Sequence, residues 1–137
     1  QGYFSDITRT FATGKNIDSK LLDAFESVRL ANSAARAKSA HGVTAGDVDL
    51  AARSIIDERG FGDFFIHRTG HGLGLEIHEE PNIKQDEEFI LTNGNIYTIE
   101  PGIYLPELGG IRIEDDVLIE SSGSRSLTTI PRNLVYL

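Results

Sequence analysis

Residues 67–81 read His67-Arg-Thr-Gly-His71-Gly-Leu-Gly-Leu-Glu-Ile-His78-Glu-Glu-Pro81, and they hold three of the four histidines in the chain. His67 and His71 are four residues apart, a spacing that would place them on one face of a helix. The three glycines between residues 70 and 74 disfavour a helix, and the His-Glu-x-x-His signature of zinc peptidases is absent. Glycines on both sides of His71 instead predict a backbone packed tightly against a neighbour, with the imidazole facing a cleft.

Two glutamates beyond this run have settings that suit metal ligands. Glu100 stands in Thr-Ile-Glu-Pro-Gly, and Glu114 stands in Arg-Ile-Glu-Asp-Asp. Imidazole and carboxylate are the ligands that borderline-hard divalent metals prefer, so this set predicts a hydrolytic metal site. Taken alone, Glu100 could equally be a turn acid before Pro-Gly, and a single histidine would most often be a core or surface residue.

Strand periodicity predicts the surroundings of Glu114. Alternate residues of a strand share one face, so Arg112 and Glu114 are expected to lie side by side. The guanidinium would then keep Glu114 ionised and fix its orientation. The alternative is an exposed ion pair that contributes little to stability.

The remaining polar candidates have more than one interpretation. Asp6, in Ser-Asp-Ile-Thr-Arg, could be a ligand, a turn acid or a partner for Arg9. Asp115 and Asp116 are expected to be exposed charges or turn formers. His41 precedes a glycine and is expected to complement a helix end.

Outward from the site, the chain divides into a helical half and a strand half. A strand is predicted at 3–12, a helix at 20–40 after a cap at Asp18 or Ser19, and a second helix from Thr44 to Gly60. Later strands are predicted at 64–66, 88–91, 95–100, 110–119 and 134–137. Consecutive helices followed by a run of strands indicate an α+β fold with a mostly antiparallel sheet.

Composition limits the classes of partner. The 137 residues carry a formal net charge of −8, from 13 basic and 21 acidic residues, without a basic block. Nucleic acid and anionic membranes are therefore disfavoured as partners. No apolar run approaches the roughly 18 residues of a membrane span. The Gly-x-Ser-x-Gly elbow and the Gly-x-Gly-x-x-Gly loop are also absent.

The chain contains neither cysteine nor methionine. The first absence excludes disulfides and thiolate sites and is compatible with a cytoplasmic protein. The second, with the opening Gln-Gly-Tyr, leads us to expect that residues 1–137 are the C-terminal portion of a single catalytic domain.

Four segments resemble signatures of the pita-bread metallopeptidases, in the branch of Xaa-Pro dipeptidases (prolidases) and Xaa-Pro aminopeptidases. They are the Ser-Asp6-Ile-Thr-Arg segment, the Gly-His71-Gly run with His78-Glu-Glu-Pro, Ile-Glu100-Pro-Gly, and Gly-Ile-Arg-Ile-Glu114-Asp-Asp. Methionine aminopeptidases share the middle two but end differently. The resemblance implies a curved antiparallel sheet with helices on one face, here truncated at its N-terminus.

The resemblance also implies roles for individual residues. The family binds two divalent ions, Mn²⁺ or Co²⁺ with Zn²⁺ as a further option, and the positions that match its ligands are Asp6, His71, Glu100 and Glu114. Glu100 would also carry a proton from the attacking water to the proline nitrogen. His67 and His78 would bind the substrate and stabilise the tetrahedral intermediate. Arg112 would support the metal ligands or the substrate.

The chain departs from the family at one point. The family's first aspartate lies about one strand upstream of Asp6, in a part that this sequence does not include. We therefore expect residues 1–137 alone to be inactive, and the full-length protein to be a cytoplasmic homodimer acting on proline-containing peptides. The alternatives are a metal-free pita-bread domain that binds proteins and a creatinase-like hydrolase that uses histidine as its acid–base group.

Overall fold

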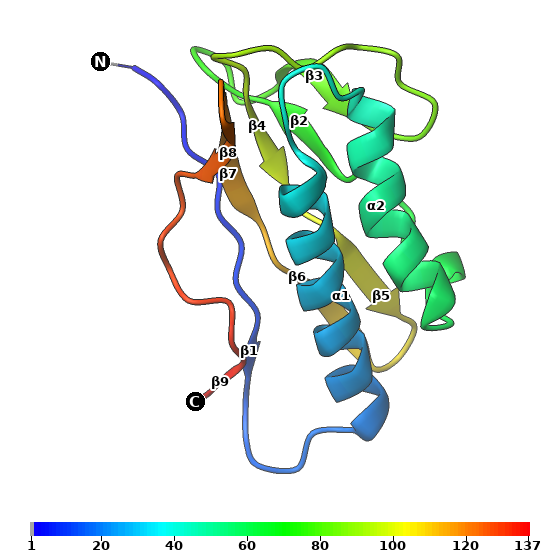
Figure 1. Ribbon diagram of the computed structural model, residues 1–137. Helices are drawn as coiled ribbons and strands as arrows, with labels where there is room; N and C mark the ends of the chain where they lie inside the picture. Colours follow the sequence, from blue (N-terminus) through cyan, green and yellow to red (C-terminus); the bar gives the residue numbers. More distant parts are fainter. Residues whose placement is uncertain (1) are drawn as a thin grey trace.

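The computed structural model describes residues 2–137, with two long helices lying on the same side of an antiparallel sheet (Figure 1). Helix α1 (Ser19–Lys38) begins after Asp18, whose carboxylate accepts a hydrogen bond from the Lys20 amide at 2.8 Å. Helix α2 (Ala45–Glu58) begins after Thr44, whose hydroxyl accepts from the Asp47 amide at 3.1 Å. Both helices and their caps confirm the sequence prediction, because short polar side chains satisfy the free amides of the first turn.

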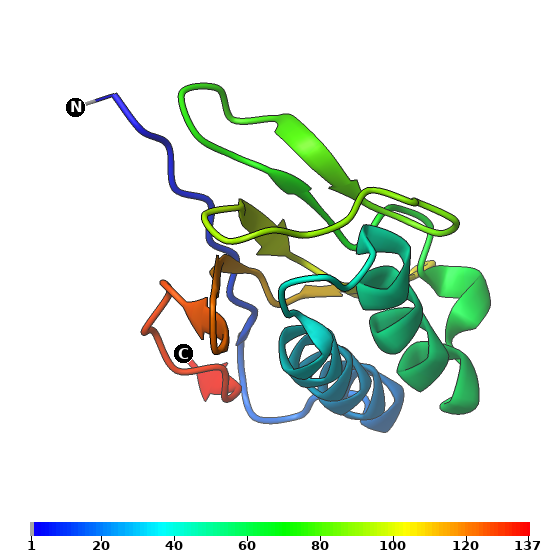
Figure 2. The same cartoon turned by 45° about the horizontal axis from the view of Figure 1, so that its top comes forward.

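The main sheet has five antiparallel strands, and Figure 2 shows it as a layer separate from the helices. Its order is β3 (Glu79–Ile83), β2 (Gly70–Gly72), β4 (Ile96–Ile99), β7 (Asp115–Glu120) and β8 (Gly123–Ser126). A second antiparallel pair joins β5 (Gly102–Leu105) to β6 (Gly109–Arg112). Near the two ends of the chain, β1 (Phe11–Ala12) pairs in parallel with β9 (Val135–Tyr136).

Strand β2 shows why glycine flanks His71. A Cβ atom on Gly70 would lie 1.8 Å from the Thr98 carbonyl oxygen of β4, and one on Gly72 would lie 2.1 Å from the Glu80 carbonyl oxygen of β3. Both distances are far below van der Waals contact. The predicted tight packing of the backbone around His71 is therefore confirmed.

The core lies between the helices and the sheet. Apolar residues of both helices form part of it, and Val28 of α1 and Val48 of α2 are fully buried. Several polar residues are also fully buried, among them Asn32 on α1 and Asp115 on β7, and each of these two is 0% exposed. Neither helix of the described residues is both long enough and apolar enough to cross a membrane.

Two predicted strands are wrong, and a third is mostly wrong. Of the predicted strand 3–12, only β1 forms, and the Asp6 amide donates to the Asp116 carboxylate at 3.2 Å in place of a strand partner. Residues 62–64 form the short 3-10 helix η1 (Gly62–Phe64) directly after α2, in place of a strand at 64–66. Residues 88–91 contribute only an isolated bridge between Ile90 and Thr44.

The predicted strand 110–119 is divided in two. Strand β6 ends at Arg112 and β7 starts at Asp115, because the Glu114 amide turns to donate to the Thr8 carbonyl oxygen at 3.0 Å. The sequence prediction missed β2, β3, β5 and β8. Strands β2 and β3 are short, contain glycine or proline, and pair with a bulge after His71, so they lack a clear strand pattern in the sequence.

Candidate metal centre

Three predicted ligands converge from three separate parts of the fold. Asp6 lies on the N-terminal segment, His71 on β2, and Glu114 on the link between β6 and β7. One ligand atom from each lies within 4.8 Å of the other two. His71 and Glu114 are each 2% exposed, whereas Asp6 is partly exposed.

Glu100 joins this group through His71. The Nε2 atom of His71 lies 3.3 Å from Oε1 of Glu100 and 3.8 Å from Oδ2 of Asp6. Glu100 directly follows β4, and its amide donates to the Thr69 carbonyl oxygen at 2.7 Å. The Thr98 hydroxyl, two residues earlier in the chain, donates to Glu100 at 3.2 Å.

The neutral form of His71 is oriented as a ligand. Its Nδ1 lies 3.0 Å from the Gly72 carbonyl oxygen, which can only accept, so Nδ1 carries the hydrogen. In the neutral ring this leaves the lone pair of Nε2 facing the carboxylates, the second-sphere arrangement that proteins use for metal-binding histidines.

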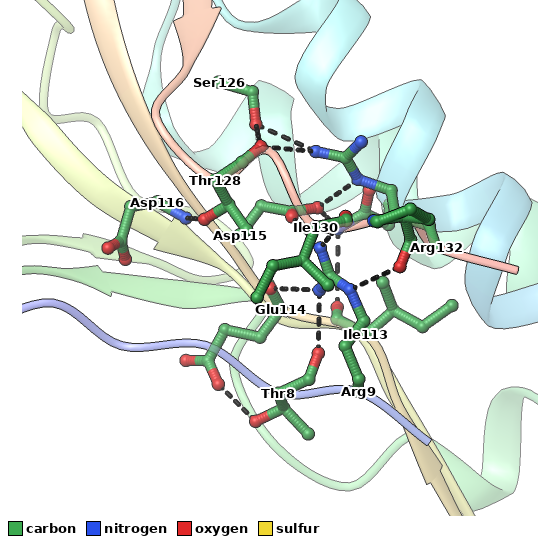
Figure 3. A network of polar contacts seen from close by, with 12 residues as sticks. Thr8, Arg9, Ile113, Glu114, Asp115, Asp116, Ser126, Thr128, Ile130 and Arg132 are labelled. Atoms are coloured by element: carbon green, nitrogen blue, oxygen red, sulfur yellow. Dashed lines mark hydrogen bonds and ion pairs between the residues drawn. The ribbon is translucent and has the colours of Figure 1, made fainter. Parts of the chain in front are cut away.

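The carboxylates of the site repel one another. Burial raises the pKa of Glu114 to about 7, with the charges of Glu100 and Asp6 adding to the effect and the hydrogen bond from Thr8 opposing it (Figure 3). Burial alone would lower the pKa of His71, but its contact with Glu100 raises it overall. The site therefore has more carboxylate groups than neighbouring cationic side chains, and it has one imidazole. This set of donors fits a divalent metal ion.

The group opens onto a cavity of about 500 Å³. The ring of His78 packs edge-on against that of His71, with 4.4 Å between their centroids. His67 turns its Nδ1 to the Arg68 carbonyl oxygen at 2.7 Å, and its buried Nε2 has no hydrogen-bond partner among the described residues. Every predicted site residue lines this cavity. The full lining is Asp6, Thr8, Ile66, His67, Arg68, His71, His78, Glu100, Tyr104, Arg112 and Glu114.

The predicted pairing of Arg112 with Glu114 is wrong. Arg112 donates from Nη1 to Glu100 at 3.3 Å and from Nε to the Tyr104 hydroxyl at 2.9 Å. Glu114 instead accepts a hydrogen bond from Thr8. The strand breaks between residues 112 and 115, so simple alternation does not extend to Glu114.

Asp115 and Asp116 also differ from expectation. They are 0% and 5% exposed, in contrast to the predicted surface or turn positions. Arg9, considered as a partner for Asp6, pairs with Asp115 at 2.7 Å instead. These partners are more than 100 residues apart in the chain, so no local pattern indicates the pairing.

Sequence reasoning missed three polar residues of the cavity, Thr8, Arg68 and Tyr104. Thr8 lies two residues after Asp6, and Tyr104 lies two residues after Gly102 on β5. The period of an extended chain could have indicated Thr8, since residues two apart share one side of the backbone with the predicted ligand Asp6. Arg68 adjoins His67 and has no comparable signal.

The sequence matches metallopeptidase family M24 over residues 1–121. It is 52% identical to a putative dipeptidase, YkvY, of Bacillus subtilis over 99% of this chain and 37% of that protein. It is 50% identical to an Xaa-Pro dipeptidase of Pyrococcus furiosus over 97% of this chain and 38% of that protein.

A solved structure gives the same result. The crystal structure of a dipeptidase from Pyrococcus horikoshii OT3 superposes with a TM-score of 0.96 at 51% identity, over 99% of this chain and 38% of that one. The chain thus spans a little over a third of the length of the relatives it matches. The predicted α+β pita-bread fold is confirmed, and the chain belongs to metallopeptidase family M24.

Proposed function

We propose that the intact protein carrying this chain hydrolyses the Xaa-Pro bond of short peptides with the help of divalent metal ions. The observation that carries this proposal is the convergence of Asp6, His71, Glu100 and Glu114 at one wall of the cavity. The relatives named as dipeptidase and Xaa-Pro dipeptidase support the substrate class.

These four residues would hold the metal, Mn²⁺ or Co²⁺ with Zn²⁺ as a further option. Bound divalent ions lower the pKa of water and polarise a carbonyl group. Glu100 would hold the transferred proton, a role supported by Thr98 and Arg112, which hold its carboxylate beside His71. Delivery of that proton to the proline nitrogen would complete general acid–base catalysis.

The two other histidines would bind the substrate. His67 has its hydrogen on Nδ1, and burial lowers the pKa of the ring, so its unpaired Nε2 is a neutral acceptor suited to a peptide or terminal N–H group. His78 packs on His71 at the cavity and would contact the substrate or the developing oxyanion.

Arg68 supports a dipeptide as the substrate. It lines the cavity and donates to the Asn82 side chain, but it forms no ion pair with a carboxylate among the described residues. A guanidinium so placed can bind the free C-terminal carboxylate of a dipeptide. A longer peptide would have no charge at that position.

The alternatives account less well for the site. A metal-free protein-binding domain has no need for buried Glu100 and Glu114 around one imidazole. A creatinase-like hydrolase would use histidine without metal, and the same carboxylates weigh against it. A homodimeric state and a cytoplasmic location remain predictions.

Metal analysis combined with substrate assays tests the proposal. We expect the intact protein to require two equivalents of metal and to cleave Ala-Pro while leaving Ala-Ala nearly intact. Turnover that survives chelation would favour the creatinase-like mechanism. Equal cleavage of both substrates would contradict the proline specificity.

A further inference from the structure

A buried polar network lies directly behind the candidate metal centre, around the carboxylate of Asp115 (Figure 3). This carboxylate accepts hydrogen bonds from Arg9 at 2.7 Å, Arg132 at 2.6 Å and the Asn32 amide at 2.9 Å. The network therefore joins four distant segments: the N-terminal segment, α1, β7 and the C-terminal segment.

Arg9 connects the backbone on both sides of the site. Its Nη1 donates to the carbonyl oxygens of Thr8 at 2.8 Å and Glu114 at 2.6 Å. Its Nη2 donates to Asp115. The planar guanidinium thus holds the N-terminal segment that carries Asp6 at a fixed distance from the backbone of Glu114.

Asn32 connects the backbones of the two glutamates. Its amide nitrogen lies 3.2 Å from the carbonyl oxygen of Ile99 and 3.4 Å from that of Ile113. These residues immediately precede Glu100 and Glu114. Arg36 Nε donates to the side-chain oxygen Oδ1 of Asn32 at 2.8 Å and so fixes the orientation of the amide.

Asp116 completes the arrangement from the opposite face of β7. Its carboxylate accepts the backbone amide of Asp6 at 3.2 Å, and Figure 3 shows its side chain turned away from that of Asp115. The backbone at Asp6 is therefore tied to Asp116, and the backbones just before Glu100 and Glu114 are tied to the Asn32 amide that binds Asp115.

Stability alone does not account for this network. Apolar residues of similar volume can often replace a buried ionic cluster without loss of stability. Three carboxylates at one cavity repel one another, however, and would separate unless their backbones were held. A rigid polar support behind the ligands opposes that separation.

We propose that Asn32, Arg9 and Asp115 are positioning residues that set the spacing of Asp6, Glu100 and Glu114 for metal binding. None of the three lines the cavity, so they act through the ligands rather than on the substrate. This inference rests on the proposed metal-dependent function.

The test compares Asn32→Leu with Val28→Ala in the intact protein. Leucine nearly preserves volume but removes the amide, whereas Val28 is a fully buried core residue one turn earlier on α1 that lies outside the network. Calorimetric titration with Mn²⁺ measures affinity, the absorption spectrum of bound Co²⁺ reports ligand geometry, and Tm reports stability. We expect Asn32→Leu to bind Mn²⁺ about 10-fold more weakly and to change the Co²⁺ spectrum. Val28→Ala should lower Tm and leave both metal readouts unchanged.

A second variant, Arg9→Lys, keeps the positive charge beside Asp115 but lacks the planar fork. Arg9→Lys should also weaken Mn²⁺ binding, and it provides the test if Asn32→Leu does not fold. Wild-type affinity in either folded variant, or an equal loss in Val28→Ala, would overturn the inference and leave the proposed function standing. Wild-type protein that binds no divalent metal would overturn both.

Discussion

Nε2 of His71 and Oε1 of Glu100 lie 3.3 Å apart, joining β2 to the residue that follows β4. Burial alone would raise the pKa of Glu100, but this contact and the charges of His71 and Arg112 lower it overall. The same contact raises the pKa of His71. A proton on the imidazole therefore balances part of the negative charge of the site, and a bound metal ion must displace it.

Metal binding is accordingly expected to weaken as the pH falls from 8 to 6. The pKa of Glu114 is about 7 and that of His71 is raised, so both groups hold protons that the metal must displace in this range. Calorimetric titrations of the intact apoprotein at pH 6.5, in buffers with different ionisation enthalpies, measure the released protons. Equal heats in all buffers would contradict the assignment of these two ligands.

Glu114 is expected to make the chelator-treated protein less stable as pH rises. Its pKa is about 7 when folded against an ordinary value near 4.5, so the folded state binds the proton more tightly. Its contribution is most favourable below pH 4.5 and is lost as pH rises through 7. Glu114→Gln should therefore raise Tm relative to wild type at pH 8 but not at pH 5. A constant difference between the two proteins would show that this carboxyl does not titrate as described.

Arg112 is expected to influence catalysis through Glu100. Removing its charge takes away one contribution that lowers the pKa of Glu100. In Arg112→Ala, the acid limb of the kcat–pH profile should move to higher pH. Tyr104→Phe is the matched control, since it removes only the 2.9 Å hydrogen bond to Arg112 Nε and should shift the limb less. An unmoved acid limb in Arg112→Ala would refute this role.

Gly70→Ala is expected to destabilise the protein strongly. The added Cβ would overlap the backbone carbonyl of Thr98, and such overpacking costs about 1–3 kcal/mol or more. Gly74→Ala is a suitable control, because its Cβ would meet only the flexible end of Glu79 at 2.8 Å. Urea unfolding of the two variants gives the comparison. Similar midpoints would mean that β2 can move away from β4 at little cost.

Arg68→Gln is expected to raise KM for Ala-Pro and leave KM for Ala-Pro-amide nearly unchanged. The amide lacks the carboxylate that the guanidinium would bind. The ratio of KM for Ala-Pro to KM for Ala-Pro-amide is measured in wild type and in the variant. A change in this ratio reports the contact with the carboxylate, because general effects on the cavity alter both KM values alike. An identical rise for both substrates would assign Arg68 a structural role through Asn82.

The helices and the tight packing around His71 could be predicted from the sequence because their signals are local. Caps at Asp18 and Thr44, and glycines around His71, each depend on neighbours within a few residues. The tight packing at His71 could be expected before its partner strands were known, because only glycine allows such an approach.

The surroundings of the carboxylates could not be predicted in the same way. Asp115 resembles a surface acid in the sequence, and it is buried because Arg9 and Asn32 reach it from segments far away in the chain. Arg112 follows strand alternation only up to the break before Asp115, so its partner is Glu100 rather than Glu114. Long-range pairing of polar groups carries no periodic signal.

The parallel pairing of β1 with β9 has a consequence for the order in which the protein folds during synthesis. Arg9 also donates to the carbonyl oxygens of Ile130 and Pro131, so the segment carrying Asp6 rests on some of the last residues of this sequence to leave the ribosome. Closing so long a loop is entropically costly and slow compared with forming α1 and α2. We expect the helices to form first and the aspartate to reach its place last, so nascent chains should acquire metal affinity only after residues 130–136 emerge.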